Sequence, residues 1–385
     1  MIWVAGFWSS VALVGYVLAG FPLLVALRAW RAPDPTADRL DEHGWPAISV
    51  IIAARNEVSC IAPKIERLLA TDYPEDRLEV VVASDGSDDG TDDAVRAFAA
   101  RGVRLLSLPR AGKAAALNAA VEHATGDVLV FTDANSWFAD GALKALVQPL
   151  ADPLIGGVAG DQRYVAGSCA DPATDGERAY WSLDRALKRA ESRGGSTISA
   201  TGAIYAVRRE LVDVVPDDVT DDFYISTGVV AAGRRLVFAP GAVAYEAVAG
   251  SADLEFARKV RIMTRGLTAV RRRATLLDPR RSGFYAIQLL SHKVLRRLVA
   301  VPVLASMACA LPLVRRHAIY RLVLVGEAAF VAAGVAGLTL GEQPVAKRRA
   351  LALPAYACLV HAAALRAGWN LARDRTITKW EPPSR

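Results

Sequence analysis

The sequence predicts an α/β domain with a mostly parallel sheet, joined to transmembrane helices. Between about residue 45 and residue 280, short β-branched runs alternate with helical patterns, which is the order of βαβ units. Residues 2–27 and three stretches beyond residue 297 are long apolar runs, as a lipid bilayer requires. We therefore expect a sheet domain held between membrane segments.

The charge distribution supports two environments within one chain of 385 residues and net charge +6. Residues 258–385 carry 23 Lys and Arg against 5 Asp and Glu, whereas residues 1–257 carry 23 against 35. The basic charges of the last third punctuate apolar runs, which is typical of a membrane surface and not of a nucleic-acid-binding stripe. We therefore expect membrane lipid, and no nucleic acid, among the partners.

The first segment is predicted to be an N-terminal transmembrane anchor over residues 1–30. Residues 2–27 contain no charged side chain, and a bilayer core needs about 20 such residues. A cleaved signal peptide would have a basic start and a shorter apolar stretch, so we favour a retained anchor. Arg28 and Arg31 follow it, and the positive-inside rule then places the next domain in the cytoplasm.

The C-terminal membrane region is predicted over residues 299–372, with apolar runs at 298–314, 322–341 and 350–365. If all three cross, the tail 373–385 lies outside, which conflicts with its basic residues, so we expect two or three spans. The run at 350–365 is the shortest and is the candidate for an interfacial position. Residues 281–298 have the pattern of an amphipathic interfacial helix, with an ordinary helix on a soluble core as the alternative. The predicted location is thus the cell membrane, multi-pass, with a cytoplasmic domain at residues 45–280.

Within that domain the patterns predict an alternation of strands and helices. Apolar, β-branched runs are typical of strands buried on both faces of a parallel sheet. The expected strands are 47–53, 78–83, 103–108 and 127–132, and the expected helices are 63–70, 92–100 and 113–124.

Acidic residues follow three of these strands, in the segments that contain Glu57, Asp85 with Asp88, and Asp133. Because ligands of such sheets bind beyond the carboxyl ends of the strands, we expect these side chains at one edge. One loop rich in Asp and Gly is equally well explained as a turn. No P-loop or dinucleotide fingerprint is present, but Lys113 opens a helix, where a lysine can meet a phosphate.

At this point the residues resemble a known family. A strand with AARNE, a strand with SDGSDDGT, then GKAAALN and a strand with TDAN look like the nucleotide-sugar-binding half of family-2 glycosyltransferases with the A-type fold. The second half adds SATGAIYAVRREL, TDD, FAPGAVAYE and FARKVRIMTRGL, followed by Ser291-His292-Lys293 and Trp380-Glu381-Pro382. Over residues 47–300 the chain resembles membrane polysaccharide synthases, the group of hyaluronan, cellulose and poly-N-acetylglucosamine synthases.

The resemblance implies roles for individual residues. Asp222 would be the catalytic base, with Asp221 as its rival, since adjacent side chains on an extended segment face opposite ways. Asp133 and Asn135 would hold a divalent cation, Mg²⁺ or Mn²⁺. The nucleotide-sugar-binding residues would be Ala53, Glu57, Asp85, Asp88, Lys113, Asp133, Arg258 and Arg261.

The function that this implies is a membrane-bound, inverting glycosyltransferase. It would transfer a hexose or N-acetylhexosamine from a UDP-sugar to a growing polysaccharide or glycan acceptor. One base without a protein nucleophile implies a single displacement with inversion. The cation and cationic side chains would stabilise the departing diphosphate.

Two departures from the family pattern keep alternatives open. The DxD position is DAN, so its second member offers a neutral amide oxygen, and the Q-x-x-R-W place holds RKVRI, without Gln and Trp. A short product or another acceptor is consistent with this, including a lipid-linked acceptor. The alternatives are a polyprenyl-phosphate or glycolipid glycosyltransferase and, in another class, a non-catalytic membrane scaffold. A homo-oligomer or an accessory export subunit is a further expectation.

Overall fold

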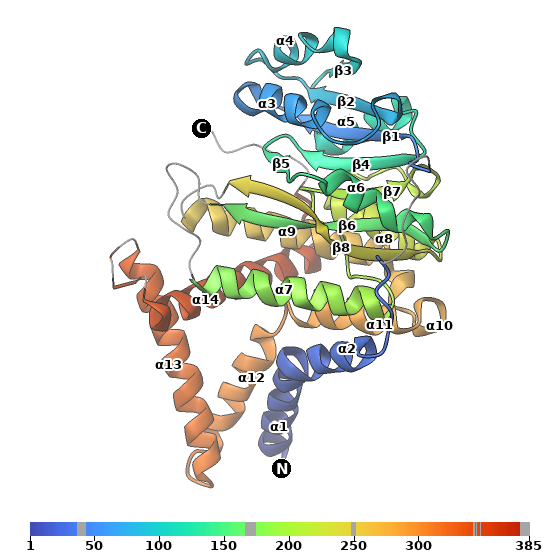
Figure 1. The fold of residues 1–385 in the computed structure, drawn as a ribbon. Helices are drawn as coiled ribbons and strands as arrows, with labels where there is room; N and C mark the ends of the chain where they lie inside the picture. Colours follow the sequence, from blue (N-terminus) through green and yellow to red (C-terminus); the bar gives the residue numbers. More distant parts are fainter. Residues whose placement is uncertain are drawn as a thin grey trace.

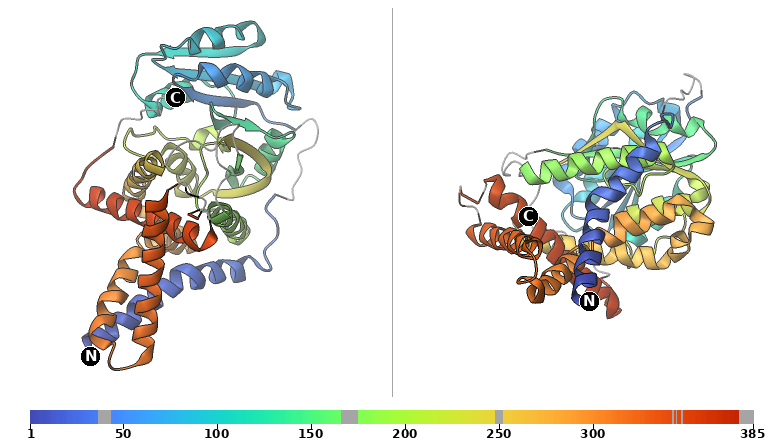
Figure 2. Two further views of the ribbon diagram at one scale, coloured as in Figure 1. Left: turned by 90° about the vertical axis from the view of Figure 1, so that its left-hand side faces the viewer. Right: turned by 90° about the horizontal axis from the view of Figure 1, so that it is seen from below.

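The computed structural model describes residues 1–36, 44–165, 175–247, 252–341, 343, 345, 346 and 348–377. In this part of the chain an eight-stranded sheet with helices on both faces stands on a set of projecting helices (Figure 1). Figure 2 shows the same arrangement from two further sides. The predicted combination of an α/β domain with apolar helices long enough to span a membrane is confirmed.

The first half of the sheet is parallel, as the sequence predicts. Its strands lie in the order β3-β2-β1-β4, with helices following the first three. Their bounds are β1 Ile48–Ala54, α3 Val58–Leu69, β2 Leu78–Asp85, α4 Thr91–Arg96, β3 Val103–Leu108, α5 Lys113–His123 and β4 Val128–Asp133. Helix α3 begins five residues before the predicted start, with Pro63 inside it.

The second half of the sheet is mixed. The order continues β7-β6-β8-β5, with β7 antiparallel to both β4 and β6, and β8 parallel to β6 and antiparallel to β5. The bounds are β5 Ser136–Phe138, α6 Ala142–Val147, β6 Ile155–Val165, α7 Asp175–Gly194, β7 Tyr205–Arg208, α8 Asp221–Ala231, β8 Arg235–Ala247 and α9 Ala252–Arg272. The parallel prediction therefore applies to the first four strands, where each crossover contains a helix.

Helices cover both faces of the sheet and leave two apolar cores. One contains Ile65, Val82 and Leu146, and the other contains Leu117 and Phe131. Burial on both faces explains why the strands read as continuous apolar runs and not as alternating ones.

The apolar segments form helices that have the length and composition expected of membrane spans. Among the described residues these are Ile2–Ala29, Ala318–Leu340 (α13) and Arg349–Ala372 (α14). A fourth arises if Phe284–Leu295 and Ala300–Leu313, which meet at 65°, count as one broken span. The first is made of α1 Ile2–Gly15, a π-helical turn Tyr16–Gly20 and α2 Phe21–Ala29. Helices α1, α12 (Ala300–Ala310) and α13 project together from the sheet domain (Figure 1).

Helix α14 runs along the sheet domain. Its Tyr356 hydroxyl accepts from Lys259 Nζ at 3.3 Å, and its Asn370 Nδ2 donates to Thr264 Oγ1 at 3.3 Å. Just beyond it, Asp374 pairs with Arg271 at 2.6 Å. Helix α14 thus contacts α9, but it also has the length and composition of a membrane span, so an interfacial position for residues 350–365 stays a prediction. The tail motif Trp380-Glu381-Pro382 lies outside the described residues.

The predicted interfacial helix is formed by α10 (Pro279–Ser282), α11 (Phe284–Gln288) and a π-helical turn (Leu289–Leu295). It packs on the sheet domain through the buried Tyr285 and Leu289, while Ile287 and Leu290 are about two-fifths exposed, at 39% and 43%. The wider π turn changes the direction of successive side chains, so the apolar residues serve both the domain and an outer face. The helix therefore has the predicted amphipathic pattern and also packs on the core of the sheet domain, as the alternative prediction had it.

Candidate active site

The acidic strand ends meet at one edge of the sheet. Strands β2, β1 and β4 are neighbours, and in their register Ala53 lies beside Ala83 on one side and Asp133 on the other. The carboxyl ends that carry Glu57, Asp85 and Asp133 therefore converge, as the strand pattern predicts.

A lysine connects the end of β4 with the start of α8 at this edge of the sheet. Lys113 Nζ, at the start of α5, lies 2.9 Å from Asp133 Oδ1 and 3.0 Å from Asp221 Oδ2. Burial acts to lower the pKa of Lys113, but the two carboxylates outweigh it and hold that pKa above its ordinary value. Burial likewise acts to raise the pKa of Asp133, and the Lys113 ammonium holds it below its usual range instead. Both groups are therefore charged at neutral pH.

Asp222 differs from its neighbour Asp221 in this respect. The pair opens helix α8 behind the N-cap Thr220, so the extended segment that the sequence suggested is wrong, and the two carboxylates diverge because of helical geometry. Asp222 Oδ1 accepts the Phe223 amide at 2.6 Å, and Asp222 makes no ion pair among the described residues. Burial and the Asp221 charge raise the pKa of Asp222 to about 6, with Lys113 opposing them.

Helix α9 presents arginines toward these carboxylates. Arg265 donates to the Val219 carbonyl at 2.8 Å, just before the acidic pair. Burial and the neighbouring Arg265 and Arg258 hold the pKa of Arg261 below its ordinary value, with Asp221 acting in the opposite direction. Arg258 forms a bidentate pair with Glu255, at 2.8 and 3.2 Å. The structure thus brings Arg261 within the field of Asp221, whereas Arg258 is paired with Glu255 on its own helix and also lies within the field of Glu246.

Glu246, at the end of β8, belongs to the site although the sequence did not single it out. Asn135 Nδ2 donates to Glu246 Oε1 at 3.4 Å, and Gln162 Nε2 donates to Glu246 Oε2. Burial and the Asp133 charge raise the pKa of Glu246 to about 7. The glutamate closes the segment FAPGAVAYE, so an acidic strand end was the available signal.

The two predicted metal ligands, Asp133 and Asn135, lie near Glu246. Asp133 and Glu246 are carboxylates that repel each other, and the amide of Asn135 lies at the Glu246 end. Gly202 leaves space beside Asp133, because a Cβ there would stand 2.8 Å from Asp133 Oδ2. No cluster of three or more His, Cys, Asp or Glu side chains with metal-site geometry occurs in the described ranges. Asp133 and Asn135 as ligands of Mg²⁺ or Mn²⁺ therefore stay predictions, in which phosphate and water would supply the rest of the shell.

Two buried hydroxyl groups near these carboxylates also indicate a ligand site. The hydroxyls of Thr201 and Tyr205 have no hydrogen-bond partner within the part of the chain that the structure describes. Burial, and then the charges of Asp221, Asp222 and Asp133, keep the pKa of Tyr205 well above its ordinary value. Unsatisfied buried polar atoms are uncommon in folded proteins and often mark the place of a bound group.

The remaining predicted residues shape the loops of the edge. Asp85 is buried, and its Oδ1 accepts the amides of Ala111 and Gly112 at 2.6 and 2.8 Å, which orients the start of α5. Asp88 is exposed and accepts from Asn56 Nδ2 at 2.9 Å, as expected of a turn residue. Their contacts with a nucleotide remain predictions, as do those of the half-buried Ala53 and of Glu57, which accepts from Cys60 Sγ at 2.9 Å.

A buried lysine lies below the predicted metal residues. Lys64 Nζ donates to Thr132 Oγ1 at 2.7 Å and to Ser136 Oγ at 3.3 Å, and it stands 4.3 Å from the centre of the Phe138 ring. Burial lowers its pKa to about 7, against the attraction of Asp133. The sequence offered one signal, a lysine on the apolar face of α3.

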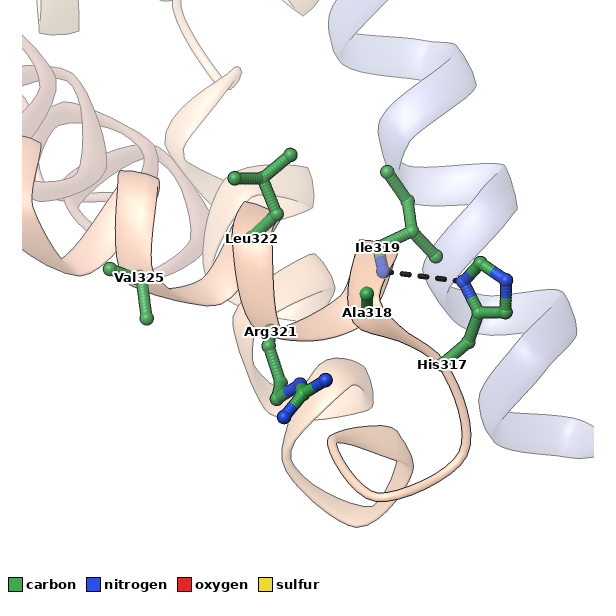
Figure 3. Close-up of a pocket in the computed structure, with 6 residues that line it drawn as sticks. All are labelled: His317, Ala318, Ile319, Arg321, Leu322 and Val325. Atoms are coloured by element: carbon green, nitrogen blue, oxygen red, sulfur yellow. Dashed lines mark hydrogen bonds between the residues drawn. The ribbon is translucent and has the colours of Figure 1, made fainter.

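A shallow hollow of the described residues lies elsewhere. It has a volume of about 540 Å³ and is lined by His317, Arg321 and four apolar residues around the start of α13 (Figure 3). His317 is occupied as the N-cap, since its Nδ1 accepts the Ile319 amide at 3.3 Å. The hollow is shallow, lies beside the turn between α12 and α13, and contains none of the acidic residues described above.

Comparison with known proteins indicates the same kind of protein as the geometry of the site. Residues 49–215 match the model of the family described as glycosyl transferase family 2. A β-monoglucosyldiacylglycerol synthase of Synechocystis is 26% identical over 229 residues, covering 57% of this chain and 48% of the relative. An N-acetylglucosaminyltransferase of Rhizobium meliloti is 25% identical over 256 residues, covering 61% and 59%. The chain thus spans about half the length of the curated relatives it matches.

A solved structure resembles nearly the whole chain. The mannosyltransferase PcManGT from Pyrobaculum calidifontis, determined in complex with GDP-Man and Mn²⁺, is 27% identical with a TM-score of 0.66. The similarity covers 95% of this chain and 98% of the other. It therefore extends beyond the sheet domain to the apolar helices.

Proposed function

Because residues 49–215 match the family model described as glycosyl transferase family 2, we propose that this chain is a membrane-attached, inverting glycosyltransferase. It moves a sugar from a nucleoside diphosphate to an acceptor hydroxyl at the membrane surface. The observation that supports the proposal is that the two aspartates of the acidic pair, Asp221 and Asp222, have different environments. Asp221 is held in an ion pair by Lys113, while Asp222 has a pKa of about 6, raised by burial and by Asp221, as a general base requires.

The reaction that this site supports is a single displacement. The acceptor oxygen attacks the anomeric carbon, the bond from that carbon to the diphosphate oxygen breaks, and the acceptor proton passes to Asp222. Lys113 and Arg261 then lie where negative charge collects on the departing diphosphate. Asp133, Asn135 and Glu246 are the residues that would hold a divalent cation, which would supply further neutralisation of that charge. Attack from the face opposite the leaving group inverts the anomeric configuration.

The site supports only the class of the donor, a nucleoside diphosphate sugar. The resemblance of the motifs implies UDP with a hexose or N-acetylhexosamine, whereas the relative from Pyrobaculum was solved with GDP-Man and Mn²⁺. Both are nucleoside diphosphate sugars, and Mn²⁺ in that complex supports the metal role of Asp133 and Asn135.

The acceptor lies at the membrane in this proposal. The β-monoglucosyldiacylglycerol synthase among the relatives supports a glycolipid acceptor, and the resemblance of the motifs to polysaccharide synthases supports a glycan acceptor. A multi-pass arrangement with the sheet domain in the cytoplasm is supported by the apolar helices and by Arg28 and Arg31. In this arrangement α14 lies in the interface.

The experiment that tests the function is a donor screen. Full-length protein in detergent with Mn²⁺ is supplied with UDP-glucose, UDP-N-acetylglucosamine and GDP-mannose, and nucleoside diphosphate release is measured with and without extracted membrane lipid. We expect release with one donor and loss of at least about a hundredfold in Asp222→Asn. The matched control is Asp217→Asn, an exposed acidic residue upstream of the same helix. Equal release by wild type and Asp222→Asn with every donor would refute the catalytic assignment.

A further inference from the structure

A buried lysine lies among the aliphatic side chains of α3. Lys64 is 3% exposed and shares the buried face of this helix with Ile61, Ile65 and Leu68. It makes no ion pair among the described residues. Burying an amine costs free energy unless hydrogen bonds offset the loss of hydration. Because an aliphatic residue would fill the same space without this cost, the contacts of the amine indicate what Lys64 does.

The hydrogen bonds of Lys64 go to the residues on either side of the turn Asp133-Ala134-Asn135. Its Nζ donates to Thr132 Oγ1 at 2.7 Å, before the turn, and to Ser136 Oγ at 3.3 Å, after it. Burial lowers the pKa of Lys64 to about 7, but both contacts are open to the neutral amine as well, because it keeps two N–H groups. The two contacts therefore do not depend on the charge of Lys64.

The amine also favours one direction for the protons of the two hydroxyl groups. Each hydroxyl has one proton, and Thr132 Oγ1 donates to the Ala203 carbonyl at 2.7 Å. Ser136 Oγ lies 3.0 Å from the Asp133 carbonyl and 3.3 Å from the Ala203 carbonyl, and a carbonyl can only accept. The two Oγ atoms are 3.0 Å apart, so one hydroxyl could also donate to the other. Because Lys64 donates to both oxygens, it favours donation of both hydroxyl protons to the carbonyl groups.

Together these groups form a buried polar hub, which we define as Lys64, Thr132, Ser136 and the Ala203 carbonyl. The hub joins three segments that are far apart in the chain, since Thr132 is 68 positions from Lys64 and 71 positions from Ala203. One segment is α3, which begins directly after Glu57, and the second is the turn between β4 and β5. The third precedes β7. The hub therefore connects parts of the chain that all border the candidate site.

The side chains of the turn have close neighbours, so a small shift of the turn would change their contacts. A Cβ at Gly202, directly before Ala203, would stand 2.8 Å from Asp133 Oδ2. Asn135 Nδ2 is 3.4 Å from Glu246 Oε1. Because the turn has three residues between its two hydroxyl-bearing neighbours, the hub holds both of its ends. The position of the predicted cation ligands thus depends on the contacts that the amine makes.

We propose, on the basis of the proposed function, that Lys64 is a positioning residue for the donor. Through Thr132 and Ser136 it holds the turn in the conformation in which Asp133 and Asn135 receive the divalent cation and, with it, the diphosphate. Lys64 acts through the turn and not by contact with the donor.

Two other roles of Lys64 lead to different results. If the residue only stabilised the core, its loss would lower the stability of the fold and leave ligand binding by the folded protein unchanged. If it acted only through a charge, Thr132→Val would have no effect on binding, since that variant keeps the lysine. Positioning requires that both substitutions weaken binding and that their effects do not add, because both break the same hydrogen bond.

The test measures binding of UDP and of GDP to the full-length protein in detergent by calorimetry, once with Mn²⁺ and once with EDTA. Lys64→Met removes the N–H groups, and Thr132→Val removes the hydroxyl at nearly constant shape. We expect each to weaken binding with Mn²⁺ about tenfold, with little change in EDTA. The double variant should lose no more than the more affected single variant. The matched control Ile65→Val, in the next residue of α3, should leave binding unchanged.

Several outcomes would overturn the proposal. These are unchanged binding with Mn²⁺ in Lys64→Met, unchanged binding in Thr132→Val, equal losses with Mn²⁺ and with EDTA, and additive losses in the double variant. Urea unfolding of each variant gives the folded fraction, so that a loss of folded protein is not counted as a loss of binding.

Hydrogen exchange of residues 132–138 distinguishes this proposal from the proposed function. The segment should exchange faster in Lys64→Met than in wild type, and Ile65→Val should not change its exchange. If wild type binds neither nucleotide with Mn²⁺, the proposed function is refuted, and the exchange still decides whether Lys64 holds the turn. Unchanged exchange in Lys64→Met would refute the positioning role itself.

Discussion

Replacing Asp222 by Asn should remove activity and stabilise the fold at the same time. The folded protein raises the pKa of this carboxyl from 3.8 to about 6, through burial and the charge of Asp221. The stability that the group contributes is therefore complete below about pH 4 and is lost as the pH rises through 6. At pH 7.5 the ionised Asp222 is destabilising, and the neutral amide avoids this penalty.

The size of both effects follows from that shift. A displacement of about two pKa units corresponds to at most about 3 kcal/mol, at ~1.4 kcal/mol per unit. A base with a pKa of about 6 is roughly nine-tenths ionised at pH 7 and one-tenth ionised at pH 5, so kcat/KM of the wild type should fall about tenfold between them. Loss of the base should cost about 10²- to 10⁴-fold in kcat.

The assay combines a pH profile of kcat/KM with urea unfolding of wild type and Asp222→Asn at pH 5 and pH 7.5. The variant should be more stable than wild type at pH 7.5, with the difference reduced to about half at pH 5 and to almost nothing below about pH 4. Its residual activity should have no acid limb near pH 6. A variant that is less stable at pH 7.5, or a wild-type profile that is flat from pH 5 to 7, would show that Asp222 is not a buried, functionally strained carboxylate.

Three further predictions concern the residues around the cation. Lys113→Gln removes the ion pairs to Asp133 and Asp221. The pKa of Asp133 should then rise, and kcat/KM should fall by about a hundredfold. An unchanged pH profile of kcat/KM would contradict this prediction. Gly202→Ala places a Cβ 2.8 Å from Asp133 Oδ2 and should weaken Mn²⁺ activation about tenfold, whereas Gly195→Ala, with nothing within 4 Å, should not change the Mn²⁺ titration. Burial and Asp133 raise the pKa of Glu246 to about 7, so Glu246 should lose a proton when Mn²⁺ binds. Mn²⁺ binding measured by calorimetry should therefore strengthen from pH 6 to pH 8. Glu246→Gln should bind Mn²⁺ more weakly and with little pH dependence.

The strand ends show what sequence reasoning can reach. The runs before Glu57, Asp85 and Asp133 are apolar because both faces of the sheet are buried, and this local signal located the first half of the site. Glu246 was not found, because its contacts with Asn135 and Gln162 join residues 111 and 84 positions apart in the chain. Those contacts depend on β5, β8 and β6 being adjacent, an order that no local pattern specifies.

The sequence by itself determined the partition between an acidic sheet domain and basic, apolar helices, since hydropathy and charge act on each segment locally. It also placed the acidic residues at strand ends. Only the tertiary structure decided how the two aspartates differ, because the helical start of α8 and the reach of Lys113 from α5 neutralise Asp221 and leave Asp222 able to titrate. The tertiary structure likewise turned Lys293 toward Phe223 and Ser291 toward Tyr16. Side-chain direction on the π turn depends on packing against α7, α8 and the first apolar helix, and a sequence pattern does not contain those neighbours.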